Sequence, residues 1–137
     1  MLNPNAKKWV EALRSGQYQQ TQGALHKETG WCCLGVACDL YAKKFPILRN
    51  WKSNHEYFDG CALGTPGIVA EWLGLRTTVG SFLLSNGEYS SLAGMNDAGV
   101  RFSVIANLIE SAPSGLFVDL VQRVAGGKRR RYNDALP

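Results

Sequence analysis

The sequence has no long uninterrupted hydrophobic segment. None of its apolar runs approaches the ~20 residues that a helix needs to cross a bilayer. The first five residues, Met-Leu-Asn-Pro-Asn, also lack the apolar centre of a signal peptide. We therefore expect a protein that stays in the cytoplasm and has no contact with a membrane.

Charged residues are also few, at 19% of the 137 residues, whereas hydrophobic residues make up 45%. This balance is typical of a globular chain and not of a disordered or coiled-coil one, and the length suits one domain. We expect a single domain over residues 1–137, with residues 128–137 as a basic tail. The net charge of +4 equals the charge of Lys128–Arg131 alone, so the basicity is local.

Histidine is scarce, and no known phosphate-binding loop is present. The two histidines, His26 and His55, lie 29 positions apart, and nothing in the sequence brings either of them to a serine or cysteine nucleophile. There is no Gly-x-Gly-x-x-Gly string after a strand and no Walker lysine. We therefore expect no catalytic residues and a protein that is not an enzyme.

The four cysteines allow a zinc site but do not favour one. Cys33 and Cys38, together with Cys61 and one histidine, would supply four ligands. Structural zinc sites usually place closely spaced cysteines in loops, however, and Cys38 falls inside an apolar segment that predicts a buried helix. We expect reduced, buried thiols, and neither a metal nor a cofactor.

Hydrophobic periodicity and capping signals predict an α+β fold with about four to five short helices and a small antiparallel sheet or hairpins. Most helix ends carry a cap, a proline or a glycine. The expected helices are one that Asn3 caps and that ends before Gly16, one over 33–42, one from Pro66 to Gly74, one that Ser103 caps and that ends before Pro113, and one over 116–124.

Polar and turn-forming strings separate these helices. Gln17–Gly23 is too polar for the core and predicts an extended strand, followed by a hairpin-like turn at Thr29-Gly30. Residues 47–64 predict a mixed loop that is rich in aromatic residues and in part strand. Asn86-Gly87 is the strongest hairpin signal in the chain.

Two residues near this hairpin have both a structural and a functional interpretation. Asn96 and Asp97 can close a tight turn in which Gly99 takes a left-handed conformation. Alternatively, the amide of Asn96 faces a pocket and reads the edge of a base. Phe82 is a core residue in the first interpretation and a stacking plate for a base in the second.

The basic run Lys128–Arg131, followed by Tyr132, also has two interpretations. It is either a solvated tail or a clamp for an anionic partner. Because the rest of the chain has no net positive charge, a long nucleic-acid track is disfavoured. A compact anion such as a nucleotide suits the patch better, since arginine binds phosphate in a bidentate geometry.

Three strings carry a resemblance to a known family. They are Trp9-Val-Glu-Ala-Leu-Arg-Ser-Gly-Gln-Tyr18, Trp31-Cys-Cys-Leu-Gly-Val-Ala-Cys-Asp39, and Asn96-Asp-Ala-Gly99 with Phe102 and Ile105-Ala106. In this order they resemble a widespread family of small bacteriophage proteins, which we identify as the anti-Thoeris sponge, the first-described Thoeris anti-defence protein. Beyond Glu110 the pattern fades.

The resemblance implies a function and a set of site residues. Such a protein sequesters cyclic ADP-ribose-type immune signals without cleaving them, in the cytoplasm of an infected bacterium, and assembles into homo-oligomers. Cyclic oligonucleotides at a separate site are a further expectation. The ligand-binding residues carried over are Phe82, Asn96, Arg123, Arg129, Arg130 and Arg131.

Two alternatives remain open on the sequence alone. A small phage nucleic-acid-binding protein would depend on the basic tail and would lose affinity steeply with salt. A hydrolase of the signalling nucleotide would release an altered product. The lack of net positive charge outside the tail disfavours the first, and the absence of a recognised catalytic motif disfavours the second.

Overall fold

The computed structural model describes residues 2–46, 51–52, 57–58 and 64–118, and it confirms a small α+β domain. The described residues contain five helices and three antiparallel pairs of short strands. None of the described helices has the length and apolar character that a membrane crossing requires. In chain order the elements are α1 Pro4–Arg14, β1 His26–Lys27, β2 Gly30–Trp31, α2 Cys33–Lys44, β3 Trp51–Lys52, β4 Tyr57–Phe58, α3 Gly67–Leu73, β5 Ser81–Leu83, β6 Tyr89–Ser91, α4 Leu92–Asp97 and α5 Phe102–Ser111.

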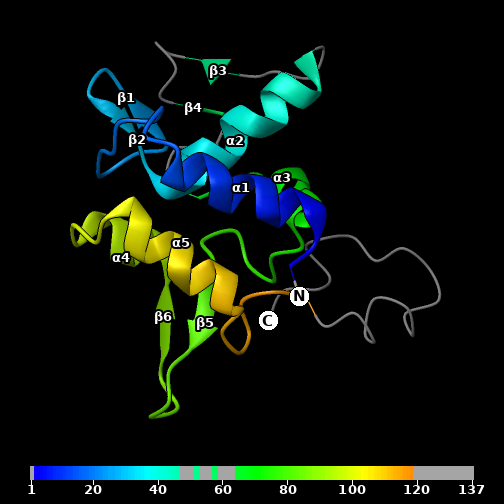
Figure 1. Cartoon of the computed structure of the whole chain (residues 1–137), viewed down its shortest axis with the longest axis vertical. Coiled ribbons are helices and arrows are strands. Elements are labelled where there is room, and N and C mark those ends of the chain that lie inside the picture. Colours follow the sequence, from blue (N-terminus) through cyan, green and yellow to red (C-terminus); the bar gives the residue numbers. More distant parts are fainter. Residues whose placement is uncertain (1, 47–50, 53–56, 59–63, 119–137) are drawn as a thin grey trace, which may run out of the picture.

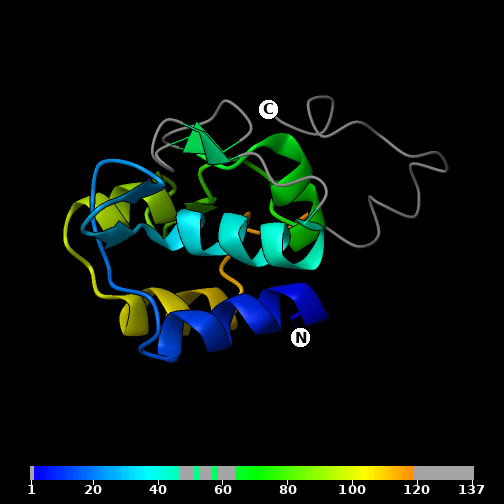
Figure 2. The ribbon, with the colours of Figure 1, turned by 90° about the horizontal axis from the view of Figure 1, so that it is seen from above.

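The helices form two layers. α1 and α5 lie side by side in one layer, and α2, α3 and α4 form the other (Figure 2). Helix α1 contacts α2 as well as α5, so it lies between them (Figure 1). The β5–β6 hairpin projects from the domain at one end of these layers (Figure 1).

Helix α1 forms where the sequence predicts it. The Asn3 side chain accepts a hydrogen bond of 2.9 Å from the backbone N–H of Ala6, and proline occupies the first turn. The helix buries Trp9, Val10 and Leu13 on one face. The Trp9 indole N–H donates to the Cys33 carbonyl oxygen at 2.9 Å, so the burial of the ring leaves no unpaired donor.

Helix α2 is almost entirely buried along its first turns, as its apolar sequence predicts. Cys32 caps it, because the Cys32 Sγ accepts from the Gly35 N–H at 3.3 Å. Gly35 lies against the backbone of Leu25, the residue before β1. A Cβ atom at position 35 would be 1.8 Å from the Leu25 carbonyl oxygen, so only glycine allows this approach.

The hairpin expected at Asn86-Gly87 is confirmed as β5 and β6. Ser81 pairs with Ser91, Phe82 with Ser90 and Leu83 with Tyr89. Since side chains alternate along a strand, the buried Phe82 and the exposed Leu83 lie on opposite faces. At the turn, Gly87 takes a φ of +90°, which the Asn-Gly signal anticipates.

Four details of the predicted elements are wrong. Gln17–Gly23 is not a strand, because its one β contact is an isolated bridge between Gln20 and Trp31. Helix α5 begins at Phe102 after Arg101, with no side-chain cap, so Ser103 is inside the helix and does not cap it. The segment Met95–Gly99 is not an isolated turn, because most of it belongs to the short helix α4. The helix expected over 116–124 does not begin at Leu116, since Phe117 instead forms an antiparallel bridge with Leu75.

This bridge belongs to a segment that joins α5 to the hairpin base. The backbone N–H of Leu83 donates to the Ser114 carbonyl oxygen at 2.8 Å, and that of Arg76 donates to the Leu116 carbonyl oxygen at 2.9 Å. The N–H of Val118, the last described residue, donates to the Gly74 carbonyl oxygen at 2.8 Å. Residues 114–118 therefore run between α3 and β5, and the chain leaves the described structure beside Gly74.

Candidate functional site

Asn96 is fully buried, and its side chain joins three parts of the chain. Its Oδ1 atom accepts from the Gln20 amide at 2.9 Å and from the Cys33 backbone N–H at 3.1 Å. Its Nδ2 atom donates to the Thr21 carbonyl oxygen at 2.7 Å. These bonds occupy the polar atoms that would read the edge of a base, so in this conformation the amide has a structural role.

Gln20 extends the same network to the start of α5. Its amide nitrogen donates to the Val100 carbonyl oxygen at 2.7 Å, in addition to Asn96. Its amide oxygen accepts from the Phe102 backbone N–H at 3.0 Å, which supplies a partner for the first turn of a helix without a side-chain cap. The polar segment Gln17–Gly23 is thus fixed to α4 and α5 by side-chain amides.

The Asn-Asp-x-Gly-x-x-Phe string acquires a structural explanation from these contacts. Asp97 accepts from the Gly23 backbone N–H at 2.9 Å, beside the Asn96 bonds. Gly99 takes a φ of +90° where the chain turns from α4 toward α5, and Phe102 is buried at the start of α5. Every specified residue of the string therefore contributes to joining α4, α5 and the polar segment.

The Cys32 and Cys33 thiols of the second string are buried and protonated. Burial raises the pKa of Cys32 to about 11 and that of Cys33 well above its usual value. The Cys33 thiol lies 3.6 Å from the Leu92 carbonyl oxygen. Since the thiolate is the nucleophile and the metal-binding form, neither thiol is activated for catalysis or for zinc at neutral pH.

The other residues considered for zinc are Cys38, Cys61 and the histidines. Within the described ranges, no group of three or more histidine, cysteine or acidic residues comes together as a metal site. Cys38 is buried in α2. Cys61 and His55 lie outside the described residues.

Phe82 is in the core and not at the surface. It lies on β5, its exposed fraction is 4%, and it belongs to the same hydrophobic cluster as the residues of α1 and α2. Phe82 and Asn96 are on neighbouring elements, but both are covered by protein. The predicted ligand residues Arg123, Arg129, Arg130 and Arg131 lie outside the described residues.

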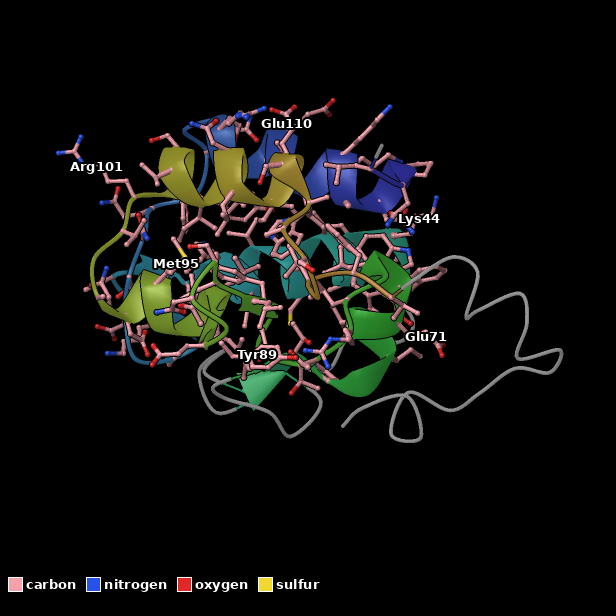
Figure 3. The ribbon with its side chains drawn as sticks, turned by 90° about the horizontal axis from the view of Figure 1, so that it is seen from below. Lys44, Glu71, Tyr89, Met95, Arg101 and Glu110 are labelled. Carbon is pink, nitrogen blue, oxygen red and sulfur yellow. The ribbon has the colours of Figure 1, made fainter. Side chains whose placement is uncertain are left out.

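Large apolar side chains are exposed on the hairpin. Of the five exposed large hydrophobic side chains among the described residues, three belong to this hairpin. They are Leu83, Leu84 and Tyr89, and the exposed fraction of Tyr89 is 61%. Tyr89 lies on the opposite side of the molecule from Glu110 of α5 (Figure 3).

Arg76 lies beside this surface and contacts Tyr89. Its guanidinium carbon is 5.5 Å from the centre of the Tyr89 ring, which is a cation–π geometry. Its Nε atom donates to the Gly115 carbonyl oxygen at 2.7 Å. Neither residue is among the ligand-binding residues expected from the sequence, because no motif links an arginine after α3 to a tyrosine after Asn-Gly.

A cluster of aromatic rings connects the polar segment Gln17–Gly23 with the β1–β2 pair and α2. The Tyr18 ring meets the Trp31 ring edge-on, with 5.4 Å between the ring centres. The centre of the His26 ring lies 3.9 Å from that of the Trp31 ring. The Tyr18 hydroxyl donates to the Asp39 carboxylate at 2.7 Å and accepts from the Lys43 ammonium at 3.2 Å. The Tyr18 hydroxyl therefore attaches the polar segment to an ion pair, Asp39 with Lys43, on α2.

Comparisons with known proteins give one family. The chain matches the family described as "Domain of unknown function (DUF8296)" over residues 2–113. No curated protein and no solved structure matches it. The match covers all five described helices and stops before the arginine-rich C-terminal residues.

Proposed function

Because the chain belongs to the DUF8296 family, whose description assigns no activity, we propose a function that combines its own residues with the sequence resemblance. The residues suit non-covalent binding of a small phosphorylated compound, and the resemblance implies that this compound is a signal of the cyclic ADP-ribose type, held by sequestration. The protein holds the signal without cleaving it and withdraws it from its receptor. The anti-defence role in an infected bacterium and the assembly into homo-oligomers are parts of this proposal that derive from the sequence resemblance.

The observation that carries the proposal is the exposed surface of the β5–β6 hairpin. Leu83 and Tyr89 are exposed and pair with each other across the hairpin, so their side chains lie side by side on one face, where a ligand or partner can bind. Here they lie beside the arginine side chain of Arg76 and the segment that leads into the C-terminal arginines. Apolar rings and guanidinium groups are the two kinds of group that a nucleotide ligand requires.

The state of the thiols supports binding over catalysis. Cys32 and Cys33 are buried, and the raised pKa values keep them protonated at neutral pH. A sequestering protein needs ground-state affinity for the intact ligand, whereas an enzyme gains rate only from interactions that strengthen in the transition state. The proposal therefore requires a tight complex and no chemical step.

A capture-and-release assay tests the proposal. The full chain is incubated with cyclic ADP-ribose, separated from free ligand and then denatured, and the ligand is identified by mass spectrometry. Recovery of intact ligand in stoichiometric amount supports sequestration. Recovery of a cleaved product supports the hydrolase, and no retention of the ligand contradicts the proposal.

The nucleic-acid alternative has its own readout. An arginine-rich tail that neutralises several phosphates would give an affinity for oligonucleotides that falls steeply with salt. The same preparation is therefore titrated with a single-stranded and a double-stranded oligonucleotide at two salt concentrations. Salt-dependent binding that disappears on removal of residues 128–137, without capture of cyclic ADP-ribose, would replace sequestration by this function.

A further inference from the structure

Arg76 is a fixed guanidinium that has no carboxylate partner among the described residues. Among the described residues, the ion pairs join Arg14 of α1 to Glu110 of α5 and Lys43 to Asp39 within α2. Arg76 instead uses its backbone N–H and its Nε atom to hold carbonyl oxygens of Leu116 and Gly115. Two of its donors therefore fix its position, and its terminal nitrogens remain for an anion.

Tyr89 supplies an open aromatic face next to that guanidinium. Its ring has the cation of Arg76 at one side and an exposed fraction of 61%. The ring stands on a paired strand opposite Leu83, and the neighbouring Phe82 is fixed in the core. An aromatic ring on a rigid hairpin binds a planar ring at a low cost in conformational entropy.

We infer that Arg76 and Tyr89 form a binding site for a nucleotide, in which the base stacks on the Tyr89 ring and the terminal nitrogens of Arg76 contact a phosphate. This inference rests on the proposed function and assigns it a place. It replaces the buried Phe82 with Tyr89 as the stacking residue. Neither side chain alone recognises both the base and the phosphate. The 5.5 Å between the Arg76 guanidinium carbon and the Tyr89 ring centre brings a charge and a ring within reach of one nucleotide.

The site is tested by measuring the dissociation constant of cyclic ADP-ribose by calorimetry for the full chain and four variants. Tyr89→Ala removes the stacking ring, and we expect it to weaken binding by about tenfold or more. Tyr89→Phe keeps the ring and is expected to bind as the unchanged protein does. Arg76→Lys keeps the charge but loses the planar fork, and a loss of about tenfold is expected.

Arg101→Lys is the matched control for Arg76→Lys. Arg101 is exposed before α5 and is outside the proposed site, so the same exchange removes a planar guanidinium and keeps the charge without touching the hairpin. Its dissociation constant should stay within about twofold of the unchanged protein. A thermal melt of each variant shows whether the fold is retained, and Arg76→Lys and Tyr89→Phe preserve most packing if the alanine variant does not fold.

The outcomes separate the two proposals. If the unchanged protein binds cyclic ADP-ribose and Tyr89→Ala and Arg76→Lys bind it equally well, the site is wrong and sequestration stands. If Arg101→Lys weakens binding as much as Arg76→Lys does, the loss is not specific to the guanidinium at position 76, and the site is again wrong. If the unchanged protein binds no cyclic ADP-ribose, both the function and the site are overturned.

Discussion

The side chain of Asn96 accepts a hydrogen bond from the backbone N–H of Cys33, 63 residues earlier in the chain, at 3.1 Å. This bond joins two of the three strings that give the sequence its recognisable pattern, the one around Cys33 and the one that begins at Asn96. It places the C-terminal part of α4 against the start of α2, so the two strings form one structural unit.

Asn96→Ala is predicted to destabilise the protein by at least about 2 kcal/mol, because it leaves the Cys33 N–H and the Thr21 carbonyl oxygen buried without their present partner. Urea unfolding measures the change. Asp97→Ala is the control, since it removes one exposed hydrogen bond to Gly23 and should cost less. Equal stabilities of the two variants would contradict the central role of the Asn96 amide.

Gly35→Ala is predicted to cost about 3 kcal/mol or more, because the added Cβ atom would be 1.8 Å from the Leu25 carbonyl oxygen. Gly87→Ala at the hairpin turn meets no atom within 4 Å and only has to adopt a φ of +90°, for which we expect about 1 kcal/mol. Thermal denaturation compares the two. A Gly35→Ala protein as stable as Gly87→Ala would show that α2 can move away from Leu25.

The buried thiols predict a loss of stability in alkaline solution. The pKa of Cys32 is about 11 in the folded protein against 9.0 without burial, so the folded state holds the proton more tightly. The stabilisation is complete below pH 9 and is lost as the pH rises toward 11, on the order of 2 to 3 kcal/mol from this thiol. Unfolding in urea from pH 8 to 11 measures the loss.

Cys32→Ser is the control for that titration. The hydroxyl can cap α2 as the thiol does, but it does not ionise in this range. Its stability should therefore fall less between pH 9 and 11 than that of the unchanged protein. Identical pH profiles for the two proteins would contradict the assignment of the effect to Cys32.

Tyr18→Phe is predicted to cost about 1 kcal/mol, because the Asp39 carboxylate loses the hydroxyl that donates to it at 2.7 Å. Burial, together with the bond to Asp39, raises the pKa of Tyr18 above 10, so the contribution of the hydroxyl is full below pH 10 and declines above it. Urea unfolding at pH 7 measures the cost. Lys43→Met, which removes a largely exposed ammonium, should cost less.

Local sequence signals predicted the fold well where one residue determines the structure. Asn3 and Pro4 begin α1, Gly74 ends α3 in a left-handed conformation, and Asn86-Gly87 closes the hairpin. The helical prediction for Phe117 is wrong. Its apolar neighbours match a helical period, but its backbone pairs with Leu75, 42 residues earlier. Pairing across that distance leaves no periodic trace in the sequence.

The candidate site was less accessible to sequence reasoning. Asn96 and Phe82 were selected for a ligand, yet both are covered by protein, because an asparagine in a marked string serves equally well to join backbone segments. Arg76 and Tyr89 come together only because residues 114–118 and the hairpin place them there. Neither residue has a local pattern that indicates the other.

The packing of α1 against α5 has a consequence for synthesis of the chain. Helix α1 leaves the ribosome before α5, with which it pairs, and Arg14 meets Glu110 at 2.9 Å across that contact. Until residue 111 has emerged, the apolar face of α1 has only part of its final cover. A nascent chain released early would therefore expose Trp9 and its neighbours to chaperones, whereas the finished chain conceals them.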